Sequence, residues 1–332
     1  MADNTPTTAN HRVAELDFLK FVFIVLMVVF HLAWFSRLHP DAKQFVYTFH
    51  MPAFLVMSGY LMNMSKTAPR FFRTIWWLLV PYAVMESGYI AMASVLPIAE
   101  HINGLSLAVF TDKLLLHPIG PYWYLHTMAL CGTLCYLVIG RLRLSVAGSA
   151  IVACCLLYVC SRCGVVSMSC ACYFLAGVVI RQVGIRLERL LAPTVLALLP
   201  LLYLAADKSC HDKATVAGIA IVWLTMSLAA SVMHLLSRAA KSEVGGISKV
   251  AGGVLSTALT MGRNTLSVIL FSPIFTILCK PLIPVLSFDS TGLLFAVVAT
   301  TVTIGGCLAT TFVLDRMHIS PFLFGKDRAL SL

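Results

Sequence analysis

The chain has 332 residues, of which 59% are hydrophobic and only 11% are charged. A soluble domain carries about 25% charged residues, so this composition excludes an ordinary soluble protein and predicts an all-α bundle of transmembrane helices. The formal net charge of +10 would suggest a nucleic-acid partner for a soluble protein. In a membrane protein, lysines and arginines first report how the chain is oriented in the bilayer, and we expect no nucleic acid to bind.

Apolar segments long enough to cross a bilayer recur along the whole chain. They predict about ten spans, at residues 18–36, 45–64, 74–97, 121–140, 145–161, 165–181, 190–206, 214–236, 264–285 and 291–313. With the N-terminus inside, the outer side holds Arg37, Lys43, Lys113, Arg162, Lys208, Lys213 and Lys280. The other 17 of the 24 lysines and arginines fall inside, which predicts that both termini are cytoplasmic. No repeat or low-complexity tract divides the chain, so residues 1–332 form one predicted domain.

The first span carries a polar residue near each end. Lys20 and His31 lie about three helical turns and about 16 Å apart on one face of a helix. Lys20 could be an anchor that snorkels to the interface, paired with Asp17 at i,i+3. His31 could be a hydrogen-bonded packing residue. Their shared face favours a third interpretation, a polar path through the membrane.

The second span contains the segment FHMPAFLVMSGYLM. His50 precedes Pro52 at the predicted outer mouth, where a proline fits the first turn of a helix. Because the first two spans form a hairpin, His31 and His50 are expected near the same leaflet. Ser58 and Gly59 are small enough to let two helices approach closely.

Two basic residues and one acidic residue stand out around the third span. Arg70 and Arg73 have the R-x-x-R spacing that puts two guanidiniums on one side of a helix, where they can hold phosphates. The alternative is ordinary positive charge beside a span. Glu86 is a candidate buried carboxylate, either to orient a histidine or to pair with a basic neighbour.

The fourth span begins with the segment GPYWYLHTM. Tyr122, Trp123 and Tyr124 form either an interfacial aromatic belt or a wall against sugar rings, and His126 lies one turn inside. Most of the 11 cysteines fall within predicted spans. Cys160 and Cys163 form one C-x-x-C pair without a second pair at metal-ligand spacing, so we expect no metal site.

Taken in order, these motifs resemble those of acyltransferase family three, polytopic membrane enzymes that move acyl groups, usually acetyl, onto carbohydrate hydroxyls. Lys20 and His31 match its R/K-x10-H signature, and the FHMP segment is similar to the second-helix block of its fucose O-acetylase-like subset. RFFRTIWWLLVPY, GPYWYL and GRNTLSVIL, which contains Asn264, resemble three later blocks. The chain departs from the pattern at Lys20, where many members have arginine, and at Ser272, where a histidine often stands.

The resemblance implies an enzyme of a bacterial-type inner membrane that acts on an envelope or exported glycan. Acyl-CoA, most often acetyl-CoA, would be its cytoplasmic co-substrate, with no bound cofactor. The expected roles are of four types: catalysis by His31 and Glu86; donor binding by Lys20, Arg70 and Arg73; acceptor binding by His50, Tyr122, Trp123, Tyr124 and His126; and structure from Pro52, Ser58, Gly59 and Asn264. His31 would act either as a base or as a transient acyl carrier. Two alternatives stay open, a glycolipid transporter or flippase without acyl chemistry and a non-catalytic scaffold.

Overall fold

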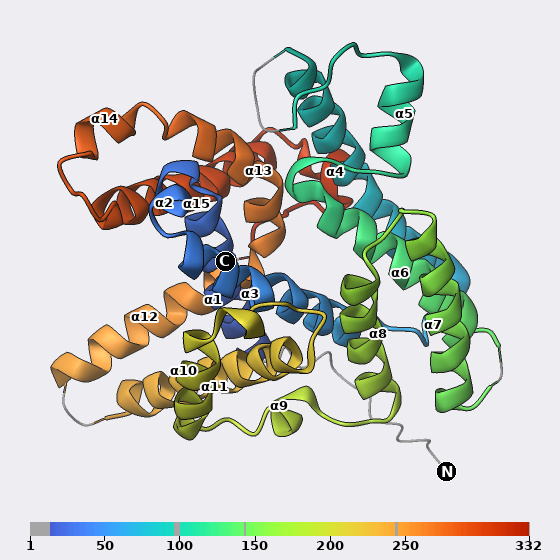
Figure 1. Cartoon of the computed structure of the whole chain (residues 1–332), viewed down its shortest axis with the longest axis horizontal. Helices are drawn as coiled ribbons and strands as arrows, with labels where there is room; N and C mark the ends of the chain where they lie inside the picture. The colour runs from blue at the N-terminus through green and yellow to red at the C-terminus, as the bar shows by residue number, and fades with distance from the viewer. Residues whose placement is uncertain (1–13, 96–99, 143, 243–244, 332) are drawn as a thin grey trace.

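The structure, a computed structural model, describes residues 14–95, 100–142, 144–242 and 245–331, and within these ranges it is built of helices without strands (Figure 1). The longer helices are α1 (Ala14–His31), α3 (Pro40–Leu61), α4 (Ala68–Val95), α6 (Trp123–Ile139), α7 (Val146–Arg162), α8 (Met168–Gln182), α11 (Val216–Ala240), α12 (Gly245–Arg263), α13 (Thr265–Leu278) and α15 (Leu293–Arg316). The shorter ones are α2 (Ala33–Leu38), α5 (Leu107–Leu115), α9 (Leu187–Leu190), α10 (Leu198–Ala206), α14 (Leu282–Leu286) and α16 (Ser320–Phe324), with 3₁₀ turns η1 (Gly120–Tyr122), η2 (Val195–Ala197) and η3 (Lys208–Cys210). The predicted all-α class is confirmed.

Several of the described helices can cross a membrane by length and composition. Four qualify singly: Ala68–Val95, Gly120–Ile139, Val216–Ala240 and Leu293–Arg316. Helices α12 and α13 qualify as a pair that is bent by 84°, which makes up to five spans. The count of about ten spans and the cytoplasmic position of both termini stay predictions. Two of the cations assigned to the inner side, Arg12 and Arg143, lie outside the described residues.

The helix boundaries differ from the predicted spans at both histidines. The first predicted span is interrupted, because α1 ends at His31 and the extended residue Leu32 separates it from α2. The placement of Pro52 in a first turn was wrong, since α3 begins twelve residues earlier with Pro40 in its first turn. Pro52 instead lies inside α3, where it removes one backbone hydrogen bond. His50 is consequently a buried residue of the helix interior.

Glycines let the helices that carry the two histidines pack backbone to backbone. A Cβ atom on Gly59 of α3 would overlap the carbonyl oxygen of Phe174 in α8, and one on Gly177 of α8 would overlap that of Val56 in α3. In the same way, Gly262 of α12 lies against the backbone of Asp17 in α1. Small residues permit such close crossings between membrane helices. This is the close helix approach that the sequence suggested for Gly59.

Asn264 occupies the break between α12 and α13. Its Nδ2 donates to the carbonyl oxygens of Thr260 (2.8 Å) and Ser331 (2.9 Å), and its Oδ1 accepts from the Ser331 N–H (2.8 Å). Asp315 accepts from the backbone N–H groups of Ala329 (2.8 Å) and Leu330 (3.0 Å). The side chains of Asn264 and Asp315 therefore fix residues 329–331 against the bent helix pair.

We expect Asn264→Ala to destabilise the protein by about 1–3 kcal/mol, because it leaves partly buried backbone groups of Ser331 without a partner. The measurement is the thermal unfolding midpoint of the protein in detergent. Asn63→Ala is the matched control, since Asn63 accepts only a local, exposed hydrogen bond from the Ser65 N–H. Equal shifts for the two variants would contradict the role assigned to Asn264.

Candidate active site

His31 is the last residue of α1, and its imidazole is held in one orientation. Its Nδ1 lies 2.7 Å from the carbonyl oxygen of Met27. A carbonyl oxygen only accepts, so Nδ1 carries the proton and the Nε2 of the neutral ring carries a lone pair. The ring lines two cavities, of about 630 and 730 Å³. His31 therefore offers a basic nitrogen to both.

His50, in α3, has the same arrangement of its imidazole ring. Its Nδ1 donates to the carbonyl oxygen of Val46 over 2.8 Å. Its Nε2 is buried and has no hydrogen-bond partner among the described residues. His50 lines the 630 Å³ cavity together with His31. An unpartnered polar nitrogen on a residue that lines a cavity can form a hydrogen bond with a ligand.

The ring of Tyr47 lies close to both imidazoles, with ring centroids 6.1 Å from His31 and 5.1 Å from His50. Its hydroxyl donates to the carbonyl oxygen of Phe30 over 3.2 Å. The ammonium of Lys43 stands 5.3 Å from the Tyr47 ring centroid, and both residues line both cavities. Neither residue is among the site residues predicted from the sequence. Their spacing of i, i+4 and i+7 with His50 puts all three on one helix face, which is the signal that would have found them.

The predicted acceptor residues divide into two groups. Trp123 and Tyr124 line the 630 Å³ cavity with His50, and the Tyr124 hydroxyl lies 2.5 Å from that of Ser58. Tyr122 and His126 are absent from that lining. The Tyr122 hydroxyl donates to the carbonyl oxygen of Leu270 (2.8 Å), and Nε2 of His126 lies 2.9 Å from that of Leu115. The structure thus brings His50, Trp123 and Tyr124 together with His31.

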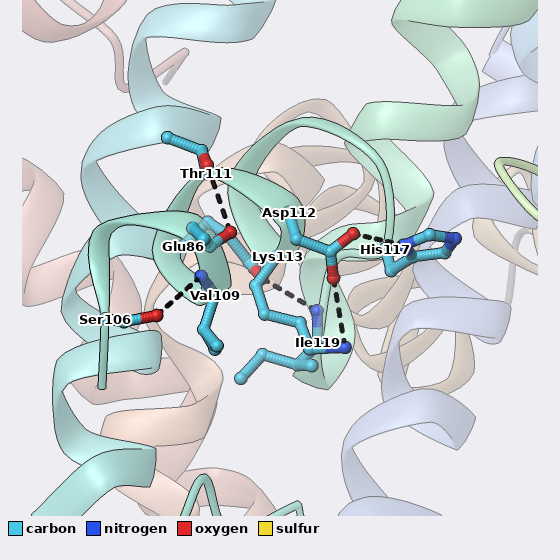
Figure 2. A network of polar contacts seen from close by, with 9 residues as sticks. Glu86, Ser106, Val109, Thr111, Asp112, Lys113, His117 and Ile119 are labelled. Carbon is cyan, nitrogen blue, oxygen red and sulfur yellow. Dashed lines mark hydrogen bonds and ion pairs between the residues drawn. The ribbon is translucent and has the colours of Figure 1, made fainter. Parts of the chain in front are cut away.

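Glu86 is fully buried in α4 and contacts backbone (Figure 2). Its Oε1 accepts from the Ile119 N–H over 2.7 Å, while Glu100 accepts from the Gly120 N–H over 2.6 Å. Glu86 lines neither cavity around His31, and no described histidine hydrogen-bonds to it. The two carboxylates hold the turn that leads into Trp123. This geometry gives Glu86 a role in positioning the cavity wall.

The segment beside that turn holds a second polar pair, shown in Figure 2. Nδ1 of His117 lies 2.7 Å from a carboxylate oxygen of Asp112, and the ammonium of Lys113 lies 3.5 Å from the other. The hydrogen bond from His117 lowers the pKa of the Asp112 carboxyl. The pair is exposed and lines neither cavity, so it contributes to the loop and not to the site.

The predicted donor residues lie away from these cavities. Lys20 forms the predicted i,i+3 ion pair with Asp17, with 2.7 Å between Nζ and Oδ1. The Oδ2 atom of Asp17 also lies 3.6 Å from Nε of Arg263. Arg70 and Arg73 are exposed on α4, and neither forms an ion pair with a described carboxylate. None of the three predicted donor residues lines a cavity that His31 lines. One continuous polar path from Lys20 to His31 is therefore not seen in these two cavities.

Fold and site together define a helical membrane protein in which two oriented imidazoles face a cavity walled by aromatic rings. The model of a family described as "Acyltransferase domain" matches residues 13–312. The chain therefore belongs to acyltransferase family three.

Among curated proteins, the chain is similar to the nodulation protein NolL of Sinorhizobium fredii (strain NBRC 101917 / NGR234). The two are 29% identical over 132 residues, which cover 35% of this chain and 34% of the relative. The match thus spans about a third of the relative's length. No solved structure matches the chain.

Proposed function

We propose that the protein is a membrane O-acyltransferase that moves an acetyl group from cytoplasmic acyl-CoA to a hydroxyl of an envelope or exported glycan at a bacterial-type inner membrane. The observation that carries this proposal is the orientation of His31. Met27 accepts from its Nδ1–H, which leaves the lone pair on Nε2 of a ring that lines the same cavity as Trp123 and Tyr124. A general base needs an accessible lone pair within reach of the proton it removes.

The proposed step is a nucleophilic substitution at the thioester. Nε2 of His31 takes the proton of the acceptor hydroxyl while the hydroxyl oxygen attacks the thioester carbonyl. The C–O bond forms, the C–S bond breaks, and the coenzyme thiolate leaves and takes up the proton from His31. If His31 carries the acyl group transiently instead, the same Nε2 is the nucleophile.

The smaller cavity suits the sugar of an acceptor. Its volume of about 630 Å³ lies within the range of about 300–1,000 Å³ that is typical of small-molecule sites. Trp123, Tyr124 and Tyr47 give it aromatic surface, and the Nε2 of His50 gives it a free acceptor nitrogen. Aromatic rings beside a few polar groups can bind and orient a sugar ring.

The donor would bind at the exposed arginines of α4. Arg70→Ala is expected to raise the KM for acyl-CoA about 10- to 100-fold, which corresponds to the loss of one hydrogen-bonded charge on a phosphate. The kcat at saturating donor should change little. Initial rates at varied acyl-CoA check this. Arg186→Ala is the control, because Arg186 is also exposed and lies at the start of a different helix, α9; an unchanged KM in Arg70→Ala would remove Arg70 from the donor site.

The experiment that tests the function compares surface glycans from cells with and without the gene by mass spectrometry. Loss of an acetyl ester from one glycan, restored by the wild-type gene and not by His31→Asn, is the expected result. Identical acetylation in the two strains would refute the proposal. The purified wild-type protein, placed in liposomes with acetyl-CoA and the isolated glycan, should release free coenzyme A from the acetyl-CoA.

The transporter alternative has one structural feature in its favour. Helices α12 and α13 are bent by 84° at Asn264, and discontinuous helices build the sites of many transporters. Such transporters usually contain corresponding broken helices in two repeats, whereas the described residues hold one such pair. Movement of a glycolipid across liposomes without acyl-CoA turnover would favour this alternative.

A further inference from the structure

Positive charge gathers around His31. Of the seven cations that are predicted to lie on the outer side, four line the two cavities. Arg37 and Lys280 line the 730 Å³ cavity, Lys213 lines the 630 Å³ cavity, and Lys43 lines both. These four residues come from three segments that are far apart in sequence, so the fold itself assembles the cluster.

These four cations have no partner carboxylate within the described part of the chain. Two other cations that are predicted to lie on the outer side have a partner carboxylate. Lys208 pairs with Asp41 at 2.7 Å, and Lys113 pairs with Asp112 at 3.5 Å. Among described residues, Asp212 is the one acidic residue of either lining, and its Oδ1 already accepts from the Ala214 N–H over 2.9 Å. The two linings together therefore hold four cations against one carboxylate, which leaves an excess of positive charge around His31.

An excess of positive charge of this kind indicates what the site binds. Like charges around one cavity repel each other, and low-dielectric walls strengthen that repulsion. A neutral ligand would leave the repulsion in place and remove water from the charges, which costs free energy. A ligand that carries a carboxylate or phosphate would relieve both effects and form charge-assisted hydrogen bonds.

The two cavities meet at shared residues. His31, Lys43 and Tyr47 line both of them. The smaller one has the aromatic wall of Trp123 and Tyr124, and the larger one has Arg37 and Lys280. A ligand with a sugar ring in the first and an anionic group in the second would pass directly beside the Nε2 of His31.

We propose that the acceptor is an anionic saccharide, bearing a carboxylate or a phosphate, and that Arg37, Lys43 and Lys280 bind this negative charge while the hydroxyl to be acylated lies at His31. This inference rests on the proposed function and names its acceptor class. The three cations are specificity-determining residues, and they take no part in the proton transfer itself.

The test measures binding without acyl-CoA, so that it does not depend on turnover. The protein is placed in phosphatidylcholine nanodiscs and titrated with oligogalacturonate or with the neutral galactose oligomer of equal length. Tryptophan fluorescence reports binding, since Trp34 and Trp123 line the two cavities. We expect the acidic oligomer to bind at least about tenfold more tightly, with an affinity that falls as salt rises.

The triple variant Arg37→Gln, Lys43→Gln, Lys280→Gln should lose this preference and bind the two oligomers alike. The matched control is Arg162→Gln, because Arg162 is an exposed outer cation that lines neither cavity, and it should keep the preference. Equal binding of both oligomers to the wild type, or a preference that survives in the triple variant, would overturn the proposal.

A lipid headgroup is the other source of an anionic group. Native mass spectrometry of protein in mixed phosphatidylglycerol and phosphatidylcholine nanodiscs distinguishes it. If the triple variant loses bound phosphatidylglycerol and the wild type shows no saccharide preference, the cations serve lipid and the proposal fails. A failure of the proposed function would give a different result. The protein would transfer no acyl group to any acceptor, but it would still prefer the acidic oligomer in the binding experiment.

Discussion

His31→Asn is expected to lower the rate of acyl transfer by about 10²- to 10⁴-fold, the usual contribution of a general base. Asparagine places an amide N–H close to where the imidazole has Nδ1–H, so it can still donate to the Met27 carbonyl oxygen. It has no counterpart to the lone pair on Nε2. The substitution therefore removes the base and keeps the hydrogen bond from residue 31 to the Met27 carbonyl oxygen at the end of α1. The measurement is release of coenzyme A at saturating donor and acceptor.

Two companion variants make the result specific. His31→Ala removes the base and the hydrogen bond, and it should be at least as inactive as His31→Asn. His234→Ala removes an imidazole from α11 that stands 4.0 Å from Glu15 and lines neither cavity, and it should transfer acyl groups at the wild-type rate. Full activity in a folded His31→Asn protein would exclude His31 as base and as acyl carrier.

The geometry also explains why the largest effect is expected at His31 and a smaller one at His50. Both rings donate from Nδ1 to a backbone carbonyl oxygen one turn earlier. His31 is accessible and lines both cavities, whereas His50 is only 2% exposed and lines one. A base must be reached by the hydroxyl and the thioester together, so the more accessible ring is the better placed one.

What the sequence predicted well rests on local chemistry. Composition alone predicts a helical membrane bundle, and helical spacing finds the Lys20–Asp17 pair that the structure confirms. Local patterns could not decide where helix α3 begins, because Pro40 and Pro52 both suit a first turn. Only the observed helix shows that Pro40 is used.

What the sequence could not predict depends on packing between distant segments. Arg37 and Lys280 line one cavity although most of the chain separates them. Glu86 holds the backbone of Ile119, a contact that spacing within the third span does not reveal. At the bend between α12 and α13, Asn264 likewise forms hydrogen bonds with Ser331, which is distant in sequence. Such contacts follow from the tertiary arrangement, and a single sequence without it leaves them open.

Gly177→Ala should destabilise the protein by about 1–3 kcal/mol, the usual cost of overpacking, and should lower acyl transfer as well. The added methyl group would overlap the carbonyl oxygen of Val56, which belongs to the backbone of α3 and cannot rotate away. Helices α3 and α8 must then separate. Because α3 carries Tyr47 and His50, the wall of the cavity moves with it.

The matched control is Gly305→Ala in α15, where a Cβ atom would meet no described atom within 4 Å. That change should leave the unfolding midpoint unaltered or raise it slightly, since alanine favours a helix over glycine by about 1 kcal/mol. Thermal unfolding in detergent and coenzyme A release are measured on both variants. If Gly177→Ala unfolds at the same temperature as Gly305→Ala, the two helices do not pack backbone to backbone. The placement of α3, and with it of His50, in the cavity wall would then rest on the packing of α3 against α1 and α11.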